Sequence, residues 1–167
     1  LTFAEADDQT ERLRNAFANK LGIGQHENVA VLLPNSLDFF LIYWALVKMG
    51  AVIVPVNTRL QPREMAHIIG STEARTLFVH RTLWKAAREA LGQCPAVERV
   101  VAVGFSDEGT VAFDTLRESP PANWDPPEIA PEDLAIIMHT SGTTGVPKCA
   151  MMRHADLLFN VKNAIIA

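Results

Sequence analysis

Hydrophobic residues along the chain alternate between short continuous runs and longer stripes with helical spacing. Over 13–21 the apolar positions recur at helical spacing, which predicts an N-terminal helix that ends at Gly22. The short apolar run at 29–33, broken at once by a Pro-Asn pair, predicts a buried strand. Ser36 is placed to cap the helix that follows, and this helix is expected to stop at Gly50.

The same alternation continues through the middle of the chain. Further strands are predicted at 51–56, 76–80 and 99–104, and further helices at 62–70 and 83–91. Pro55 places the far end of its strand at a terminus or an edge, because proline cannot donate to a sheet. Each helix between two strands must fold back on the sheet. We therefore predict an α/β fold with three layers, a mostly parallel sheet covered by helices on both faces.

The longest apolar run, 39–47, has nine residues, about half the length that a membrane-spanning helix requires. We interpret it as a buried helix with Trp44 in the core. Trp84 and Trp124 are expected to be packing residues that are partly exposed. The N-terminal segment has no basic start followed by an apolar stretch, so the sequence predicts no signal peptide.

The amino-acid composition of the chain changes between residues 119 and 133, where proline becomes frequent. Five of the ten prolines fall between 119 and 131, and a segment so poor in backbone donors is expected to run along the surface. The predicted organisation is therefore an N-terminal α/β subdomain at 1–118, a Pro-rich connector at 119–133, and the start of a next subdomain at 134–167. In this last part, two apolar strands flank a polar loop, and a helix follows from about Ala155.

Composition narrows the class of protein. The 167 residues are 49% hydrophobic with a net charge of -4, which is typical of a globular domain and argues against a nucleic-acid partner. Cys94 and Cys149 are too far apart for a CxxC motif, which favours a reducing, cytoplasmic setting. The chain begins with Leu and ends within an apolar helical pattern, so we expect it to be part of a longer protein. A piece cut through an α/β domain would expose apolar surface, which makes self-association possible.

The segment "HTSGTTGVPK", His139 to Lys148, carries the strongest chemical signal. Its two glycines let successive N–H groups point to one side, its four hydroxyls add donors, and its lysine adds a positive charge. An ordinary polar turn also uses Ser, Thr and Gly, but it needs neither four hydroxyls nor a lysine after a proline. The P-loop of nucleotide hydrolases has a different glycine-to-lysine spacing and opens a helix. The natural ligand of this segment is a polyphosphate.

The stretch "TSGTTGVPK" resembles the phosphate-loop signature of the adenylate-forming superfamily, which includes acyl- and aryl-CoA synthetases, luciferases and adenylation domains of peptide synthetases. The segments "LTFAEADDQTERLRNAFA" and "WALVKMGAVIVPVNTRLQPREMAHII" are similar to two upstream blocks of that superfamily, so the resemblance covers nearly the whole chain. "PVNTRL" followed by "PREM" resembles fatty-acyl and related CoA ligases more than amino-acid-activating domains. The later blocks of the superfamily are not found, and the chain alone is expected to be inactive.

The resemblance implies a two-step reaction. A carboxylate, expected to belong to a fatty or aryl acid, attacks the α-phosphate of ATP to give acyl-AMP and pyrophosphate, and the thiol of coenzyme A then displaces AMP. Fixed donors and cations would do most of this work. Mg²⁺ would accompany the nucleotide, and no protein metal ligand is predicted. Thr144 and Lys148 are the expected catalytic residues, and the expected nucleotide-binding set is Thr140, Ser141, Gly142, Thr143, Thr144, Gly145 and Lys148.

The chain departs from the superfamily pattern after the lysine. Cys149 stands where the superfamily usually has glycine, and we interpret it as a small packed hydrophobe rather than a nucleophile. His139 precedes the loop, where a packing role is expected, and Arg59 is expected to anchor a turn through backbone hydrogen bonds. Two alternatives to the CoA ligase stay open: an amino-acid-activating domain that feeds a carrier protein, and a nucleotide-binding module that has lost ligation.

Overall fold

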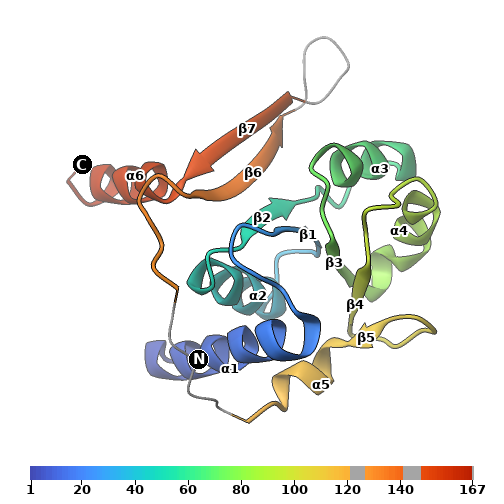
Figure 1. The fold of residues 1–167 in the computed structure, drawn as a ribbon, viewed down its shortest axis with the longest axis horizontal. Coiled ribbons are helices and arrows are strands. Elements are labelled where there is room, and N and C mark those ends of the chain that lie inside the picture. Colours follow the sequence, from blue (N-terminus) through green and yellow to red (C-terminus); the bar gives the residue numbers. More distant parts are fainter. Residues whose placement is uncertain (121–126, 141–147, 167) are drawn as a thin grey trace.

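A computed structural model of the chain describes residues 1–120, 127–140 and 148–166. The described residues form a seven-stranded sheet in the order β5-β4-β3-β1-β2-β6-β7 (Figure 1). Neighbouring strands are parallel except for the β6–β7 pair, which is antiparallel at one edge. The strands are β1 (Asn28–Leu32), β2 (Val52–Pro55), β3 (Thr76–His80), β4 (Arg99–Val103), β5 (Val111–Ala112), β6 (Leu134–Thr140) and β7 (Lys148–Arg153).

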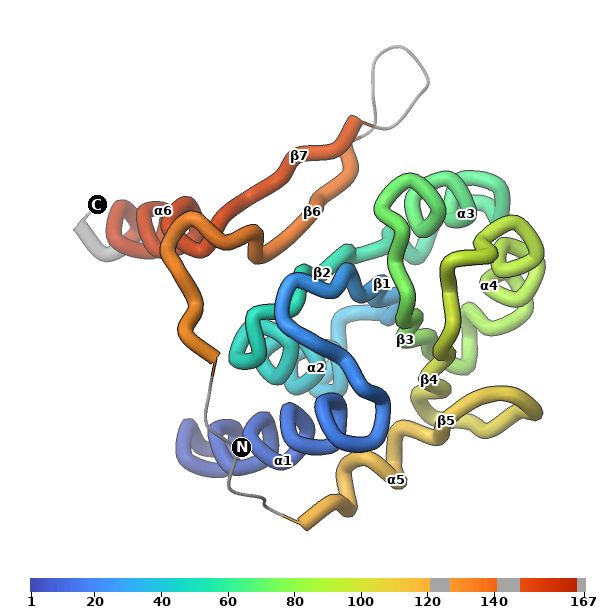
Figure 2. The backbone as a smooth tube through the Cα atoms, viewed as in Figure 1, coloured from blue at the N-terminus to red at the C-terminus, as the bar shows by residue number. Residues whose placement is uncertain are grey.

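Helices cover both faces of the sheet, which confirms the predicted three-layer α/β fold. Figure 2 shows one group, α1 (Phe3–Leu21), α2 (Leu37–Lys48) and α5 (Phe113–Arg117), on one face. The other face carries α3 (Pro62–Ser71) and α4 (Trp84–Leu91), the latter after the short 3₁₀ turn η1 (Arg81–Leu83). In the sheet, β2 lies on one side of β1 and β3 lies on the other, so the chain reverses its direction across the sheet after β2. Because crossover connections between parallel strands are right-handed, α2 and α3 lie on opposite faces.

Two hydrophobic cores result, one on each face of the sheet. Successive side chains of a strand point to opposite faces, so Val29 packs with α1 and α2, whereas Ala30 packs with α3 and α4. On the first face, the fully buried rings of Phe17 and Phe78 lie 5.0 Å apart between centroids and connect α1 to β3. These cores fix the central strands whose ends position the candidate site.

Local signals explain where the helices begin and end. The Thr2 side chain accepts a hydrogen bond from Glu5 N, and Gly22 ends α1 with φ of 65°, a conformation that glycine adopts without a steric penalty. The Ser36 side chain accepts from Phe39 N and caps α2 as predicted. Pro62 occupies the first turn of α3, where its missing N–H costs nothing.

The structure corrects several details of the sequence predictions. Trp44, expected in the core, is 43% exposed on the outer side of α2. Trp84 is half-buried as expected, and its Nε1 donates to Asp107 Oδ2 at 2.6 Å. Trp124 lies outside the described residues. The structure also contains β5 and α5, which the hydrophobic pattern did not predict, and α3 runs one residue past Gly70. The last helix is α6 (His154–Ile166), close to its predicted start.

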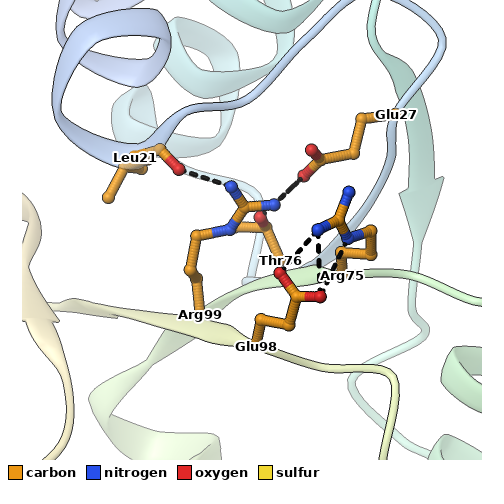
Figure 3. Close-up of polar contacts among 6 residues, drawn as sticks. All are labelled: Leu21, Glu27, Arg75, Thr76, Glu98 and Arg99. Atoms are coloured by element: carbon orange, nitrogen blue, oxygen red, sulfur yellow. Dashed lines mark hydrogen bonds and ion pairs between the residues drawn. The ribbon is translucent and has the colours of Figure 1, made fainter.

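A cluster of charged side chains lies where β1, β3 and β4 begin (Figure 3). Glu27 Oε1 accepts from Arg99 Nη2 at 2.5 Å and from Thr76 Oγ1 at 2.9 Å, and Arg99 also donates to the Leu21 carbonyl at the end of α1. The neighbouring Arg75 binds both carboxylate oxygens of Glu98. This cluster connects α1 to three strands at the edge opposite the candidate site.

Within the described ranges, no helix is both long and apolar enough to cross a membrane. The Pro-rich segment contacts the body near its C-terminal end, where Gln25 Nε2 donates to the Glu128 carbonyl at 2.9 Å. Strand β6 then joins the same sheet as β1 to β4, with Ile136 opposite Ile53 of β2.

Candidate functional site

The candidate site lies at the carboxyl edge of the parallel strands. Ile53 of β2 pairs with Ile136 of β6, so Pro55, the last residue of β2, lies level with Met138. The last two residues of β6, ending at Thr140, therefore extend past the end of β2. In open α/β sheets, ligands bind outside the carboxyl ends of the strands. The β6–β7 hairpin is placed at such an edge (Figure 1).

The hairpin brings together the two ends of the predicted phosphate loop. Thr140 is paired with Lys148 across the two strands, and its Oγ1 lies 3.4 Å from the Lys148 carbonyl oxygen. Both side chains are exposed. The other predicted nucleotide-binding residues, Ser141, Gly142, Thr143, Thr144 and Gly145, lie outside the described residues.

The described ends of the loop suit an anionic ligand. Lys148 is exposed at the first position of β7, and within the described part of the chain no carboxylate lies within ion-pairing distance of it. A lysine ammonium is a compact point charge that binds phosphate oxygens well. The same ranges contain no group of three His, Cys, Asp or Glu side chains that could hold a metal ion.

A cleft of about 470 Å³ opens beside the hairpin at the same edge. This volume is within the range of small-molecule sites. The cleft is lined by the residues that follow β1 and β2, by the end of β6 and by Phe39 of α2: Leu33, Pro34, Asn35, Phe39, Pro55, Val56, Asn57, Thr58, Met138 and His139. Six of the ten lining residues are apolar, and the other four carry amide, hydroxyl and imidazole groups that can orient a ligand.

The turn after β2 is shaped by Asn57. Its Oδ1 accepts a hydrogen bond from the backbone N–H of Arg59 at 2.9 Å, as asparagine side chains often do in turns. Arg59 lies in this turn and is exposed, but the hydrogen bond that shapes the turn joins its backbone N–H to the Asn57 side chain and does not involve the guanidinium. The turn places Asn57 and Thr58 on the wall of the cleft.

His139 and Cys149 form a second cross-strand pair, next to Thr140 and Lys148. The Cys149 Sγ lies 3.1 Å from His139 Nε2. Cys149 is exposed, so its interpretation as a packed hydrophobe is wrong: β7 is an edge strand, and nothing in the described residues covers this face of it. Burial lowers the pKa of His139, and the nearby His67 of α3 lowers it further. His139 is consequently a neutral imidazole at pH 7.

The sequence did not predict the cleft or the His139–Cys149 pair. A signal for the cleft was present, because Asn35 and Asn57 each come just after a buried strand, where the carboxyl ends of parallel strands meet. The pair requires the hairpin register, which sets position 139 opposite 149, and a hydrophobic pattern does not fix that register across a loop.

Comparison with known proteins identifies the family. The profile of the family described as "AMP-binding enzyme" matches residues 1–167, the whole chain. The chain belongs to this family. The chain is similar to the 4-hydroxybenzoate–CoA/benzoate–CoA ligase of Rhodopseudomonas palustris, 27% identical over 164 residues. That match covers 98% of this chain and 30% of the relative.

Solved structures of AMP-binding enzymes share the fold. An anthranilate–CoA ligase in complex with anthranoyl-AMP superimposes with a TM-score of 0.91 at 28% identity, over 97% of this chain and 31% of that protein. A long-chain-fatty-acid–CoA ligase from Archaeoglobus fulgidus gives a TM-score of 0.89 at 32% identity, over 100% of this chain and 33% of its own. The chain therefore spans about a third of the length of these relatives.

Proposed function

We propose that this chain supplies the phosphate-loop portion of an ATP-dependent acid–thiol ligase. The reaction joins a carboxylate to AMP with release of pyrophosphate and then transfers the acyl group to coenzyme A. The observation that carries the proposal is the β6–β7 hairpin, which pairs Thr140 with Lys148 at the carboxyl edge of a sheet in an AMP-binding enzyme. The relatives compared above are CoA ligases by name, which supports the same class.

The hairpin's own residues would act by charge and hydrogen bonding. A carboxylate and a triphosphate repel each other, so the first step needs fixed donors and cations near the phosphates. The exposed Lys148 ammonium and Thr140 hydroxyl stand at the two ends of the loop and can both face one ligand. The loop residues 141–145 would add donors to the β- and γ-phosphates, with Thr144 near a nucleotide-bound Mg²⁺, which neutralises phosphate charge when bound.

The cleft beside the hairpin would hold part of a substrate. Its mixed lining of apolar residues with amide and hydroxyl groups suits the fatty or aryl portion of an acid, or the pantetheine arm of coenzyme A, which itself carries amides. The relatives act, by name, on both aromatic and long-chain acids, so the proposed substrate class is a hydrophobic carboxylic acid. We further propose a reducing, cytoplasmic setting, which agrees with two free cysteines.

The test of this function is carboxylate-dependent exchange of pyrophosphate into ATP by the full-length product of the gene. A panel of benzoates, short acids and long-chain acids is supplied with Mg²⁺, and each acid is assayed in turn. We expect exchange with at least one hydrophobic acid, and thioester formation when coenzyme A is added. The absence of exchange with every acid, in a sample shown to be folded, would contradict the ligase function.

The acceptor thiol separates the CoA ligase from an amino-acid-activating enzyme. Coenzyme A and a phosphopantetheinyl carrier protein are offered in parallel after adenylation. The proposal expects the thioester on coenzyme A. Transfer only to the carrier, or exchange only with amino acids, would assign the enzyme to the other class.

A further inference from the structure

The proposed ligase reaction assigns no role to the contact between His139 and Cys149. The pair stands on the exposed edge of the hairpin, with Sγ 3.1 Å from Nε2. The two residues are directly opposite each other in the antiparallel register, so the strand pairing itself holds the thiol beside the ring. A nucleophile within hydrogen-bond reach of a base is the arrangement that activates a weak nucleophile.

A neutral His139 ring can accept a proton through Nε2, the nitrogen that faces the thiol. Its Nδ1 is buried, and no hydrogen-bond partner for it lies among the described residues. Burial of the ring lowers the pKa of His139, so the neutral form predominates at pH 7. With the ring neutral and its proton on Nδ1, Nε2 presents a lone pair toward the sulfur. His139 can therefore take the thiol proton as the sulfur attacks.

The chain offers an internal contrast in its other cysteine. Cys94 is buried in the core on the α3 and α4 face, and its thiol lies 3.5 Å from the Ala66 carbonyl and 3.4 Å from the Ala90 carbonyl. Burial raises the pKa of Cys94. A buried thiol with no base is inert, whereas the exposed Cys149 has both access and a base.

We propose that His139 and Cys149 form a thiol–imidazole pair that makes Cys149 a site of reversible modification by low-molecular-weight disulfides. Cys149 attacks one sulfur of the disulfide RS–SR while its proton passes to His139 Nε2. The new Sγ–S bond forms as the S–S bond of the reagent breaks, and the leaving thiolate takes the proton to become RSH. The Cys149 sulfur is oxidised, and half of the reagent is reduced.

The position of the pair gives the modification a local consequence. His139 lines the cleft at the carboxyl edge, and Cys149 follows Lys148 directly in β7. A group attached to Cys149 would therefore stand at the mouth of this cleft and beside the hairpin. The rate of thiol modification is measured without nucleotide, so it can be tested separately from the proposed function.

The experiment measures the rate at which each thiol reacts with dithiodipyridine, a neutral aromatic disulfide, by the absorbance of the released thiopyridone. Mass spectrometry of the digested chain assigns the modified residue. We expect a fast phase at Cys149 and slow reaction at Cys94. In His139→Ala the fast phase should slow about tenfold, less than the roughly 100-fold of a typical general base because the lowered pKa weakens this one, and added imidazole should restore part of the rate.

The matched control moves the thiol by one residue without touching the histidine. In the double variant Cys149→Ser, Ala150→Cys, the new thiol is equally on exposed β7 but points to the opposite face, opposite Met138. Lys148 lies on the same face as position 150, and its positive charge favours the thiolate there. This charge would speed the reaction of the relocated thiol, so a slower rate at position 150 cannot be attributed to it. We expect the relocated thiol to react about tenfold more slowly than Cys149.

Two results would overturn the proposal. One is a relocated thiol at position 150 that reacts as fast as Cys149, since exposure alone would then explain the rate. The other is a folded His139→Ala variant, verified by circular dichroism, in which the Cys149 rate is unchanged. If His139→Ala does not fold, the comparison between positions 149 and 150 decides alone.

Discussion

The charged cluster at the amino edge of the sheet offers a comparison of two ion pairs that differ in burial (Figure 3). The side chains of Glu27 and Arg99 are 8% and 19% exposed, whereas those of Glu98 and Arg75 are 52% and 54% exposed. The perturbation is Glu27→Gln, which keeps the shape of the side chain and an oxygen that can accept from Thr76. The substitution removes the charge that faces Arg99.

The expected magnitude follows from the burial of the partner. Breaking a fully buried pair costs about 3–5 kcal/mol, because the remaining charge has lost its partner. Arg99 retains some exposure and its hydrogen bond to the Leu21 carbonyl, so we expect Glu27→Gln to lower the free energy of unfolding by about 2 kcal/mol. Glu98→Gln is the matched control, and it should have little effect because solvent screens that pair.

Urea unfolding followed by circular dichroism measures both variants against the wild-type chain. The midpoint should shift clearly for Glu27→Gln and hardly at all for Glu98→Gln, with an unchanged slope for both. Equal shifts in the two variants would refute the reasoning, because burial would then not decide the value of these pairs. A double-mutant cycle with Arg99→Met isolates the coupling between Glu27 and Arg99 from other effects of each substitution.

Three further outcomes are expected from single substitutions. Ser36→Ala should lower the free energy of unfolding by about 1 kcal/mol in urea titrations, because Phe39 N loses its capping acceptor; an unchanged midpoint would show that the cap is not stabilising. Phe17→Ala should cost about 3–5 kcal/mol in the same assay, since the ring is fully buried against Phe78; a loss below 1 kcal/mol would contradict the packing described here. Burial lowers the pKa of His154, so the unfolded state binds protons more readily and stability should fall as the pH drops below about 6.5. In His154→Gln the free energy of unfolding should fall less steeply between about pH 7 and 5. An identical pH dependence of the free energy of unfolding in both proteins would exclude His154 as the source of the decline.

The layer architecture could be predicted from the sequence because each element carried its own signal. The run at 29–33 is apolar throughout and the run at 76–80 has an apolar centre at 77–79, which is typical of short strands buried on both faces, and β1 and β3 are found there. Ser36 and Pro62 marked helix starts through local hydrogen bonding and a fixed φ angle. These signals depend on neighbours within a few residues, so they can be recognised in the sequence without knowledge of the fold.

Features that depend on distant contacts could not be predicted in the same way. Trp44 lies in a continuous apolar run, yet α2 buries only the side that faces the sheet, and Trp44 falls on the other side. Helix α5 has five residues, too few for a helical pattern, and it is held by Phe113 and Leu116 in the core between α1 and β4. The exposure of Cys149 follows from the edge position of β7, which the sequence alone does not fix.

The chemistry of the candidate site stays a prediction from the sequence, and the structure places only the two ends of the predicted loop. The hydroxyls, glycines and lysine of 140–148 pointed to a polyphosphate from residue type alone, and the hairpin then placed Thr140 opposite Lys148. The cleft formed by residues after β1 and β2 required the order of strands in the sheet. Its residues come from segments far apart in sequence, and local patterns carry no information about such neighbours.

The central claim is that the β6–β7 hairpin binds the phosphates of ATP, and pyrophosphate exchange by the Lys148→Ala variant of the full-length gene product tests it most directly. If the ammonium of Lys148 stabilises the negative charge that develops as AMP is transferred to the carboxylate and pyrophosphate leaves, the exchange rate should fall by about 100- to 1000-fold in this variant. Lys85→Ala, an exposed lysine on α4, is the control and should exchange at the wild-type rate. Wild-type exchange by a folded Lys148→Ala variant would contradict the account.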